Sequence, residues 1–576
     1  MSQDFQKVLV KDDRLMVTDS VRYAVIKGGQ NMTCAQFNAI GSNGSTGFTS
    51  NINFNVQVPS QETVLSRNAL ISTTLQFEIT ATPRTTGAYT GPGSGFVFNY
   101  GGIDGFGPFP FHQLVNSVQW TINNNTISQN TRDILSTLCR IHDKRFLQRY
   151  NGMTPVLFDT YGSYTSLTST TNNNPFLGWD KMGLDNDLAP RGILPITVTG
   201  DANYAAGDGT TPRVIVVSIA VTEPVLLSPF VFAGDEGQGM YGIQNFNAVY
   251  NLSSSANTAV RFGGDLGARY ASLPVVVFQG AFSPRLLLQF LTPHPSDLLP
   301  SRNVVPYYEM PRYISTCTAF TTNQSGTLTS SSLQLNQIPD KIYIICARQM
   351  DNRLVSDADA FLTITGISIN WNNSSGLLSS ATQQDLWRMS VENGINQTWA
   401  EFSGKADVSA ASATGVTVIP TSGSVLCLEF GKDIELKDDY YAPGSLGNFQ
   451  LQFNLQVTNN LPYTASNFNL LTIVQNSGVF SLERGVSSSY LGILTKSDVL
   501  EASREKAVAY SDAIRMVGGG KVGNFFKSLG SHLGTVAKYA APVVRDLAVG
   551  AIKKRMGMGS TGAGKRDMGA LEDRMY

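Results

Sequence analysis

The chain has little charge. Asp, Glu, Lys and Arg make up 15 % of its 576 residues, whereas about a quarter of a typical soluble domain is charged. Helical bundles need Ala, Glu, Lys and Leu at helical spacing, so this composition argues against such a fold. Aromatic residues reach 10 % and there are 54 glycines, while Asn, Ser and Thr fill much of the remainder. This mixture is typical of many short strands joined by polar loops.

Residues that carry out chemistry are also scarce. The cysteines lie far apart and form no Cys-x-x-Cys pair, which predicts buried free thiols in a reducing compartment. The histidines show no metal-site spacing and no recognisable partner nucleophile. We therefore expect no catalytic residue, no metal ligand and no cofactor. The cysteines are Cys34, Cys139, Cys317, Cys346 and Cys427, and the histidines are His112, His142, His294 and His532.

Two short motifs are candidates for binding sites. Gly237–Gly242 matches G-x-G-x-x-G, but a dinucleotide site needs a helix next, and Ile243–Leu252 has the pattern of a strand. We interpret this motif as a loop. Around Lys432 and Lys437 lies an acidic cluster that lacks the glycine turn and ligand order of a calcium loop. We interpret it as a solvated loop that makes contacts. Its acidic residues are Asp433, Glu435, Asp438 and Asp439.

Long apolar runs are missing as well. Met1–Asp19 is polar, so no secretory signal is expected there. The longest apolar stretch, Leu273–Leu291, is interrupted by Pro274, Gly280 and Pro284. Because a transmembrane helix needs about 20 uninterrupted apolar residues, we expect no stable transmembrane insertion.

The length requires more than one domain, since domains average roughly 100–200 residues. A proline-rich stretch that begins at Thr292 separates two β-rich halves, and no residue-level repeat is apparent between them. Residues from Glu501 onward carry a net charge of +6, whereas the rest of the chain carries −7. The expected parts are an N-terminal arm (1–20), a first domain (21–291), a linker (292–304), a second domain (305–480), a C-terminal helical segment (481–519) and a basic tail (520–576).

Strand patterns fill both halves. In Leu75–Thr80 and Phe449–Val457 apolar and polar residues alternate, which places one face against a core and the other face outward. Runs such as Val214–Val217 are apolar on both faces and should lie deep. The same reasoning predicts a strand over Val225–Phe232. Two antiparallel β domains of this size suggest sandwiches or jelly rolls.

The segment Ile367–Gly404 joins a strand-like run, a polar turn, a short helix and a final stretch anchored by tryptophan. Its residues indicate architecture rather than a nucleophile, a metal cluster or a phosphate site. We interpret Trp371, Trp387 and Trp399 as structural anchors in a core or at a subunit seam, because large aromatic side chains bury extensive surface. Stacking on sugars or bases is the alternative.

The C-terminal part holds a candidate processing site. Ser497–Val517 has helical character with capping-box spacing at its start, and Met516–Gly520 ends it. That sequence is similar to sites cut by adenovirus-type cysteine maturation proteases, which places a candidate cleavage between Gly519 and Gly520. A glycine cap followed by a flexible linker is an equal alternative. The basic remainder suits contact with a double-stranded DNA genome or with a membrane surface.

Several segments, spread from about residue 20 to about residue 530, carry a family resemblance. They are Tyr23–Asn38, Pro59–Leu65, Tyr307–Tyr313, Ile338–Tyr343, Ile367–Gly404 and Cys427–Val457. In this order they resemble the double jelly-roll major capsid proteins of virophages, of the Sputnik-like type, and of related polinton-like viruses. No single segment is a catalytic signature. The specificity lies in many matches in one order.

The resemblance implies an all-β fold of two tandem eight-stranded jelly-roll barrels. It also implies that three copies form a pseudo-hexameric capsomer, and that capsomers tile an icosahedral shell around double-stranded DNA. The expected partners are the other copies of a homotrimer, neighbouring capsomers, penton and minor capsid proteins, and a viral cysteine maturation protease. The expected location is the virion, after assembly in the host cytoplasm or a virus factory.

A second class of function remains open. A β-sandwich that binds carbohydrate, such as a viral spike or a lectin-like protein, would use the tryptophans as platforms for sugars. That hypothesis predicts glycan binding that is lost on Trp→Ala substitution without loss of assembly. An enzyme built on a β-sandwich is disfavoured, because the sequence lacks a recognisable acid–base constellation.

Overall fold

The computed structural model describes most of the body of the chain, and the described residues all lie within one compact unit, Leu9–Val499. The expected N-terminal arm, most of the expected linker and everything from residue 493 onward fall outside them. The described residues are 21–22, 32–40, 50–84, 96–100, 104–142, 147, 150, 196–200, 209–230, 238–263, 266–292, 301–349, 352–355, 359–409, 416–436, 441–461 and 466–492.

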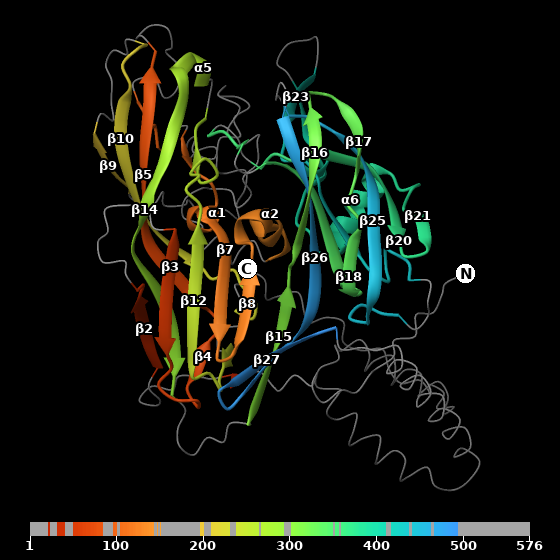
Figure 1. Ribbon diagram of the computed structural model, residues 1–576. Coiled ribbons are helices and arrows are strands. Elements are labelled where there is room, and N and C mark those ends of the chain that lie inside the picture. Colours follow the sequence, from red (N-terminus) through yellow and green to blue (C-terminus); the bar gives the residue numbers. More distant parts are fainter. Residues whose placement is uncertain are drawn as a thin grey trace, which may run out of the picture. The chain divides into compact units, whose positions relative to one another are not determined.

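The first half is a sandwich of two antiparallel sheets (Figure 1). The larger sheet is built around β5 (Leu70–Pro83), β10 (Arg213–Pro224) and β14 (Tyr270–Leu291). The facing sheet consists of β3 (Asn51–Gln57), β12 (Asn245–Leu252), β7 (Val115–Ile122) and β8 (Asn125–Gln129). Shorter strands are β1 (Val21–Arg22), β2 (Met32–Asn38), β4 (Val64–Ser66), β6 (Gly105–Phe106), β9 (Ile196–Gly200), β11 (Gln238–Met240) and β13 (Val260–Arg261).

The second half is a sandwich of the same kind. Its larger sheet contains β15 (Arg302–Glu309), β16 (Arg312–Phe320), β19 (Lys341–Arg348), β24 (Val425–Glu429), β26 (Ser466–Glu483) and β27 (Val486–Leu491). The facing sheet contains β17 (Ser325–Thr329), β18 (Leu333–Gln337), β20 (Thr363–Trp371), β21 (Ser374–Leu377) and β25 (Leu446–Thr458). A separate hairpin joins β22 (Lys405–Ser409) to β23 (Val416–Pro420).

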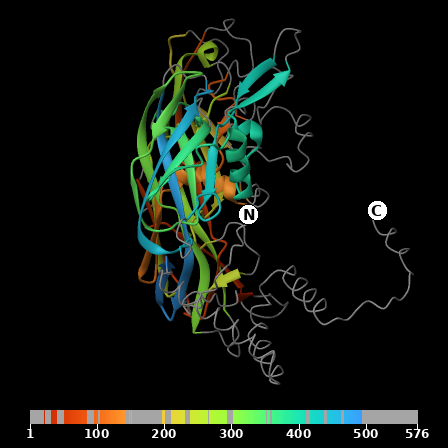
Figure 2. The ribbon, with the colours of Figure 1, turned by 90° about the vertical axis from the view of Figure 1, so that its right-hand side faces the viewer.

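Short helices connect the strands. They are α1 (Pro110–Leu114), α2 (Thr131–Ile141), α5 (Leu266–Arg269), α6 (Gln383–Glu392) and α7 (Trp399–Phe402). Both α6 and α7 begin with a capping box, in which a threonine and an acidic residue three positions later satisfy each other's backbone N–H. The strand, turn and helix expected over Ile367–Gly404 are therefore confirmed. Figure 2 shows α6 and the β22–β23 hairpin on the same side of the strands. Within the described residues, no helix has the length and hydropathy to cross a membrane.

Alternation places the core where the sequence predicted it. In β5 every second residue is buried, and Leu75, Phe77 and Ile79 have no exposed surface. Phe453 and Leu455 of β25 are equally buried, while the glutamines between the apolar positions face outward. Each pair of facing sheets thus encloses one apolar core, as two-layer sandwiches do.

The two halves share one topology. The larger sheets run β2–β14–β5–β10 in the first half and β16–β26–β19–β24 in the second, and the facing sheets run β3–β12–β7–β8 and β17–β25–β20–β21. Even the central aromatic residues correspond. Trp120 of β7 stacks on Phe246 of β12 at 5.3 Å, and Trp371 of β20 stacks on Phe449 of β25 at 5.4 Å. The structure therefore contains a repeat of topology between the two halves, although no residue-level repeat is apparent in the sequence.

Strands from the second half complete the core of the first. Val305 and Tyr307 of β15, with Phe480 and Leu482 of β26, belong to the apolar cluster of the first sandwich. The next strand, β27, lies beside β8, and the Ser487 hydroxyl donates a hydrogen bond to the carbonyl oxygen of Ile122, the last residue of β7. The first sandwich, whose last strand ends at Leu291, therefore depends on residues as far along the chain as Leu482 and Ser487.

Some sequence predictions were wrong. Val214, in a run expected to lie deep, is 44 % exposed, because only one face of β10 packs into the core. The residues from Val225 to Phe230 form a turn rather than a strand, because Pro224 and Pro229 have no N–H to donate to a sheet; the apolar side chains between them are buried and hold this turn against the core. The helical segment expected over 481–519 begins instead with the end of β26 and with β27. Its remaining residues lie outside the described part of the chain.

Leu482 tests whether the strand from the second half is an integral part of the first core. Leu482→Ala should lower the free energy of unfolding by about 2–5 kcal/mol, because it removes buried methyl groups and leaves a cavity. Urea unfolding followed by tryptophan fluorescence measures the change. Val486→Ala, at a position that is 55 % exposed on the next strand, should lower it by less than about 0.5 kcal/mol. Equal effects of the two substitutions would contradict the shared core.

Candidate functional site

A sheet with two buried faces forms the seam between the halves. Ile342, Ile344 and Cys346 of β19 line the core of the second sandwich, while Tyr343, Ile345 and Ala347 point to the opposite face. That opposite face is covered by α2 of the first half, through Ile134, Leu135 and Leu138. Because neither face of β19 meets solvent between its two ends, the strand is apolar from Ile342 to Ala347 instead of alternating.

Among the described residues, two ion pairs cross this seam. The guanidinium of Arg140 on α2 lies 3.2 Å from the carboxylate of Asp359, and both side chains are at least 92 % buried. The Ser136 hydroxyl donates to the same carboxylate at 3.2 Å. Arg312 of β16 forms the second pair, with Asp133 of α2. Loss of one partner of a buried pair carries a large penalty, so this network opposes any sliding of α2 along the sheet.

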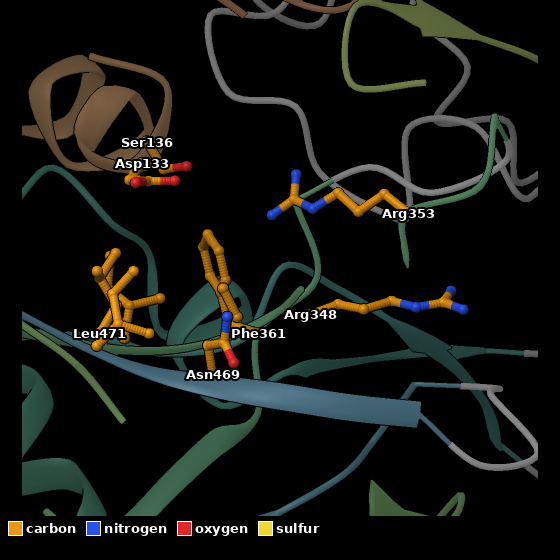
Figure 3. Close-up of a pocket in the computed structure, with 10 residues that line it drawn as sticks. Asp133, Ser136, Arg348, Arg353, Phe361, Asn469 and Leu471 are labelled. Atoms are coloured by element: carbon orange, nitrogen blue, oxygen red, sulfur yellow. The ribbon is translucent and has the colours of Figure 1, made fainter. Parts of the chain in front are cut away.

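A small cavity lies within the seam (Figure 3). Asp133 and Ser136 of α2 lie on one side of it, and Phe361 and Leu471 of the second half lie on the other, with Arg353 beside them. Its volume is about 30 Å³, which is roughly the share of one water molecule in the liquid. Pockets for small molecules are about ten times larger or more, so this cavity is a packing gap in the seam.

Glu223 and His112 are buried side by side in the first half. Both side-chain oxygens of Glu223 accept backbone hydrogen bonds, from Phe111 at 2.9 Å and from His112 at 3.1 Å. Burial raises the pKa of Glu223 to about 8, although those two hydrogen bonds oppose the shift. Burial likewise lowers the pKa of His112 to about 4. The imidazole Nε2 of His112 donates to the carbonyl oxygen of Pro224 at 2.7 Å, so both residues serve to hold α1 against β10.

His142, at the C-terminal end of α2, has a similar role at the seam. Burial lowers the pKa of its imidazole to about 3. Its Nε2 lies 3.3 Å from the hydroxyl of Tyr308 on β15, which belongs to the second half. A neutral imidazole in this place links the two halves by a hydrogen bond and adds no buried charge.

A third ion pair is internal to the first half. Arg269 makes two parallel hydrogen bonds of 2.8 Å to Asp104, and neither side chain has exposed surface. The same carboxylate accepts backbone hydrogen bonds from Asn99 and Gly263, and Arg269 also donates to the hydroxyl of Tyr270. With its oxygens satisfied in this way, Asp104 fixes the loops around it.

The predicted anchor tryptophans fall into two environments. Trp371 is buried in the core of the second sandwich. Trp387 of α6 and Trp399 of α7 are partly buried and meet edge to face, with ring centres 5.8 Å apart. The indole N–H of Trp387 donates to the carbonyl oxygen of Gln397 at 3.0 Å, so it is engaged within the chain. Such an arrangement favours packing over a platform for sugars.

The remaining candidate residues are dispersed. Gln238–Met240 form strand β11 instead of the expected loop, and strand β12 follows, as expected, where a dinucleotide site needs a helix. Asp433 accepts hydrogen bonds from Asn393 and from the backbone of Glu429, so its loop makes contacts with the end of α6. The described residues contain no cluster of three or more groups that could hold a metal ion. Gly519 and Gly520 lie outside the described residues, as do His294, His532, Asp438 and Asp439.

The cysteines differ in burial. All five are free thiols, as predicted. Cys139, Cys346 and Cys427 are buried, whereas Cys34 is exposed on β2 and Cys317 is intermediate. Cys34 was therefore wrongly predicted to be buried, since its side chain lies on the exposed face of β2 together with Gln36 and Asn38.

The buried acid and histidines predict the pH dependence of stability. Both histidines are neutral in the folded chain, so stability rises between about pH 4 and 6.5, where only the unfolded chain binds their protons. Glu223 stays protonated in the folded chain up to about pH 8, so stability falls from pH 6.5 to 8. Glu223→Gln should abolish that fall, which amounts to at most about 1.4 kcal/mol per pH unit. Urea unfolding at a series of pH values measures it. An unchanged decline in the variant would contradict the assignment.

Comparison with known proteins gives the context for this seam. Residues 3–291 match the family model of the first domain of the Sputnik virophage major capsid protein, and residues 310–478 match that of the C-terminal domain of major capsid protein V20. The putative capsid protein V20 of Sputnik virophage is 31 % identical over 558 residues, which cover 93 % of this chain and 87 % of that protein.

Solved structures agree with this. A chain of the cryo-electron microscopy structure of the Sputnik virophage is similar with a TM-score of 0.68 and 26 % identity, over 86 % of this chain and 95 % of that one. The crystal structure of the mavirus major capsid protein has the same fold, with a TM-score of 0.66 and 15 % identity over 87 % of this chain and 98 % of that one. The predicted resemblance is thus confirmed, and the chain belongs to the family of Sputnik virophage major capsid proteins.

Proposed function

We propose that three copies of this chain form a pseudo-hexagonal capsomer, and that such capsomers tile an icosahedral shell around double-stranded DNA. The chain is a virophage major capsid protein, and its place is the virion capsid. The observation that carries the trimer is the internal repeat of two sandwiches joined by a buried seam. Because each chain supplies two bodies of one topology, three chains supply six bodies for a six-sided unit.

Further contacts, with neighbouring capsomers and with penton and minor capsid proteins, are proposed for the sheet around β25. None of its strands contains Asp, Glu, Lys or Arg. Gln450, Gln456 and Thr327 are exposed on its outer face. Interface cores are depleted in charged residues, and a neighbour can press on this face without removing an ion from water. Many such modest contacts add up in a shell.

We propose that the chain carries out no reaction of its own. The groups that could take part in acid–base chemistry hold structural hydrogen bonds instead: Glu223 accepts from the start of α1, and His112 donates to a backbone carbonyl. The seam cavity has room for roughly one water molecule. Function then resides in surfaces that meet other copies.

The C-terminal tail is proposed to be cut between Gly519 and Gly520 by a viral cysteine maturation protease. Paired glycines let an extended strand enter a narrow protease groove, because they carry no Cβ. The residues after the cut are basic, which suits electrostatic contact with the phosphate backbone of the genome before or after cleavage.

Intact-mass spectrometry of purified particles tests the cleavage. The capsid protein should end at Gly519, and the full-length form should be a minor species. Substitution of Gly519 by valine should block the cut, because a β-branched side chain obstructs the groove that admits glycine. A chain that still ends at Tyr576 in mature particles would contradict the proposal.

The trimer is tested with the recombinant full-length chain. Analytical ultracentrifugation should give a mass three times that of the 62.2 kDa chain, and negative-stain electron microscopy should show particles with a hexagonal outline. Permanent interfaces are large and apolar, so the trimer should persist on dilution to nanomolar concentration. A stable monomer or dimer under these conditions would contradict the proposed function.

A further inference from the structure

The repeated topology gives every element of one half a counterpart in the other. Helix α2 follows the β7–β8 hairpin, and α6 follows the β20–β21 hairpin. The strands β10, β5 and β14 correspond to β24, β19 and β26. Within the chain, α2 covers the outer face of β24, β19 and β26. The first half therefore has an equivalent face on β10, β5 and β14, and the second half has an equivalent helix.

The covered face in the second half is a set of cross-strand rows. In one row, Val425 of β24 is opposite Ile345 of β19, which is opposite Leu471 of β26. The neighbouring row consists of Cys427, Tyr343 and Ile473. All of these side chains belong to the buried seam cluster, so the contact with α2 keeps them from water.

The equivalent rows of the first half are exposed. Val214 is opposite Thr80, which is opposite Val275, and in the next row Val216 and Val277 flank Glu78. Val214, Val275 and Val277 are 44 %, 59 % and 46 % exposed. β-branched side chains are favourable on a half-buried sheet surface, but here they meet solvent in the single chain.

The positions match as well as the strands. Val275 and Leu471 are each the sixth residue of their strands, β14 and β26. Thr80 and Ile345 are each fourth from the end, in β5 and β19. The exposed valines therefore occupy the same place on the first sandwich as the covered seam residues occupy on the second.

Helix α6 has an open face, and two of its positions match seam residues of α2: Arg388 and Val391 are the sixth and ninth residues of α6, as Ser136 and Cys139 are of α2. Leu386 and Ser390 turn toward its own sandwich and are buried. Gln384, Arg388 and Val391 lie at helical spacing on the other side and are exposed, with Val391 at 42 %. By contrast, α2 lies between the two halves and is buried on most of its surface (Figure 1).

We propose that α6 of one copy packs on the outer face of β5, β10 and β14 of a second copy, in the place that α2 takes within the chain. The inference rests on the proposed trimer and names its contact surface. The interface is heterologous, because each copy offers a helix on one side and a sheet on the other. A ring of three copies then contains six such contacts, three within chains and three between them.

Charge supports this pairing. Glu78 lies in the middle of the valine rows, where its carboxylate accepts a hydrogen bond from Gln279 at 3.1 Å. On α6 the guanidinium of Arg388 is exposed, 3.5 Å from Asp385 and 3.8 Å from Glu392. The opposite charges of Glu78 and Arg388 repeat the pattern of the internal seam, where arginine and aspartate pair at the margin of an apolar contact.

Single charged substitutions in the full-length chain test the proposal. Val277→Asp on the sheet and Val391→Asp on the helix should each weaken the trimer by roughly tenfold or more in dissociation constant, because each puts an unpaired charge into the contact. Val486→Asp, at a position 55 % exposed on β27, is the matched control and should leave the trimer unchanged. Sedimentation velocity over a dilution series measures assembly, and the thermal unfolding of each variant monitors the fold of the chain.

Each result decides a separate point. If both interface variants dissociate at higher concentrations than the unsubstituted chain, and the control does not, the contact is supported. If Val277→Asp or Val391→Asp dissociates over the same concentrations as the unsubstituted chain, the contact is overturned while the trimer itself stands. If the unsubstituted chain is monomeric, the proposed capsomer fails instead. Should a variant unfold, Val277→Lys or Val391→Lys replaces it, with the same expected loss of the trimer.

Discussion

The burial of β19 on both faces is the constraint on which the rest of the structure depends. A strand that packs into a core on one side and against α2 on the other cannot shift by one residue without turning both sets of side chains the wrong way. The seam therefore fixes how the second sandwich is attached to the first. β15 and the end of β26 reinforce it, since they supply side chains to the first core.

The fixed orientation of the two sandwiches matters because a closed shell is built by repeating the same contacts between identical copies. A heterologous contact closes into a ring only when the rotation from one body to the next is correct, and otherwise it continues as an open filament. Buried ion pairs such as Arg140 with Asp359 add little net stability, because their attraction roughly offsets the cost of removing both charges from water. In a misaligned seam the two charges would be buried without a partner, and that cost would remain. In this chain the polar network thus favours one orientation of the two sandwiches, and the apolar residues around it supply the stability.

Alternating patterns identified the strands reliably, because a period of two residues is a local property. β5 and β25 were predicted in this way, and a short helix was expected after the polar turn in Ile367–Gly404, where α6 lies. The residues around Val225 misled the prediction, since an apolar run indicates burial and does not specify a strand. The seam could not be predicted, because Arg140 and Asp359 are 219 residues apart and nothing local relates them. The family resemblance implied two tandem barrels, but the residues themselves did not reveal the internal repeat. It survives in topology and in single residues such as Trp120 and Trp371, without similar sequence around them.

Native-state hydrogen exchange tests most directly whether the two sandwiches form one body. The slowest amides of β5 and β12 in the first half, and of β19 and β25 in the second, should exchange with one common free energy and one common dependence on denaturant, because neither core opens alone. If the amides of β19 and β25 exchange at a lower free energy and with a separate denaturant dependence, the halves unfold independently and the account is contradicted.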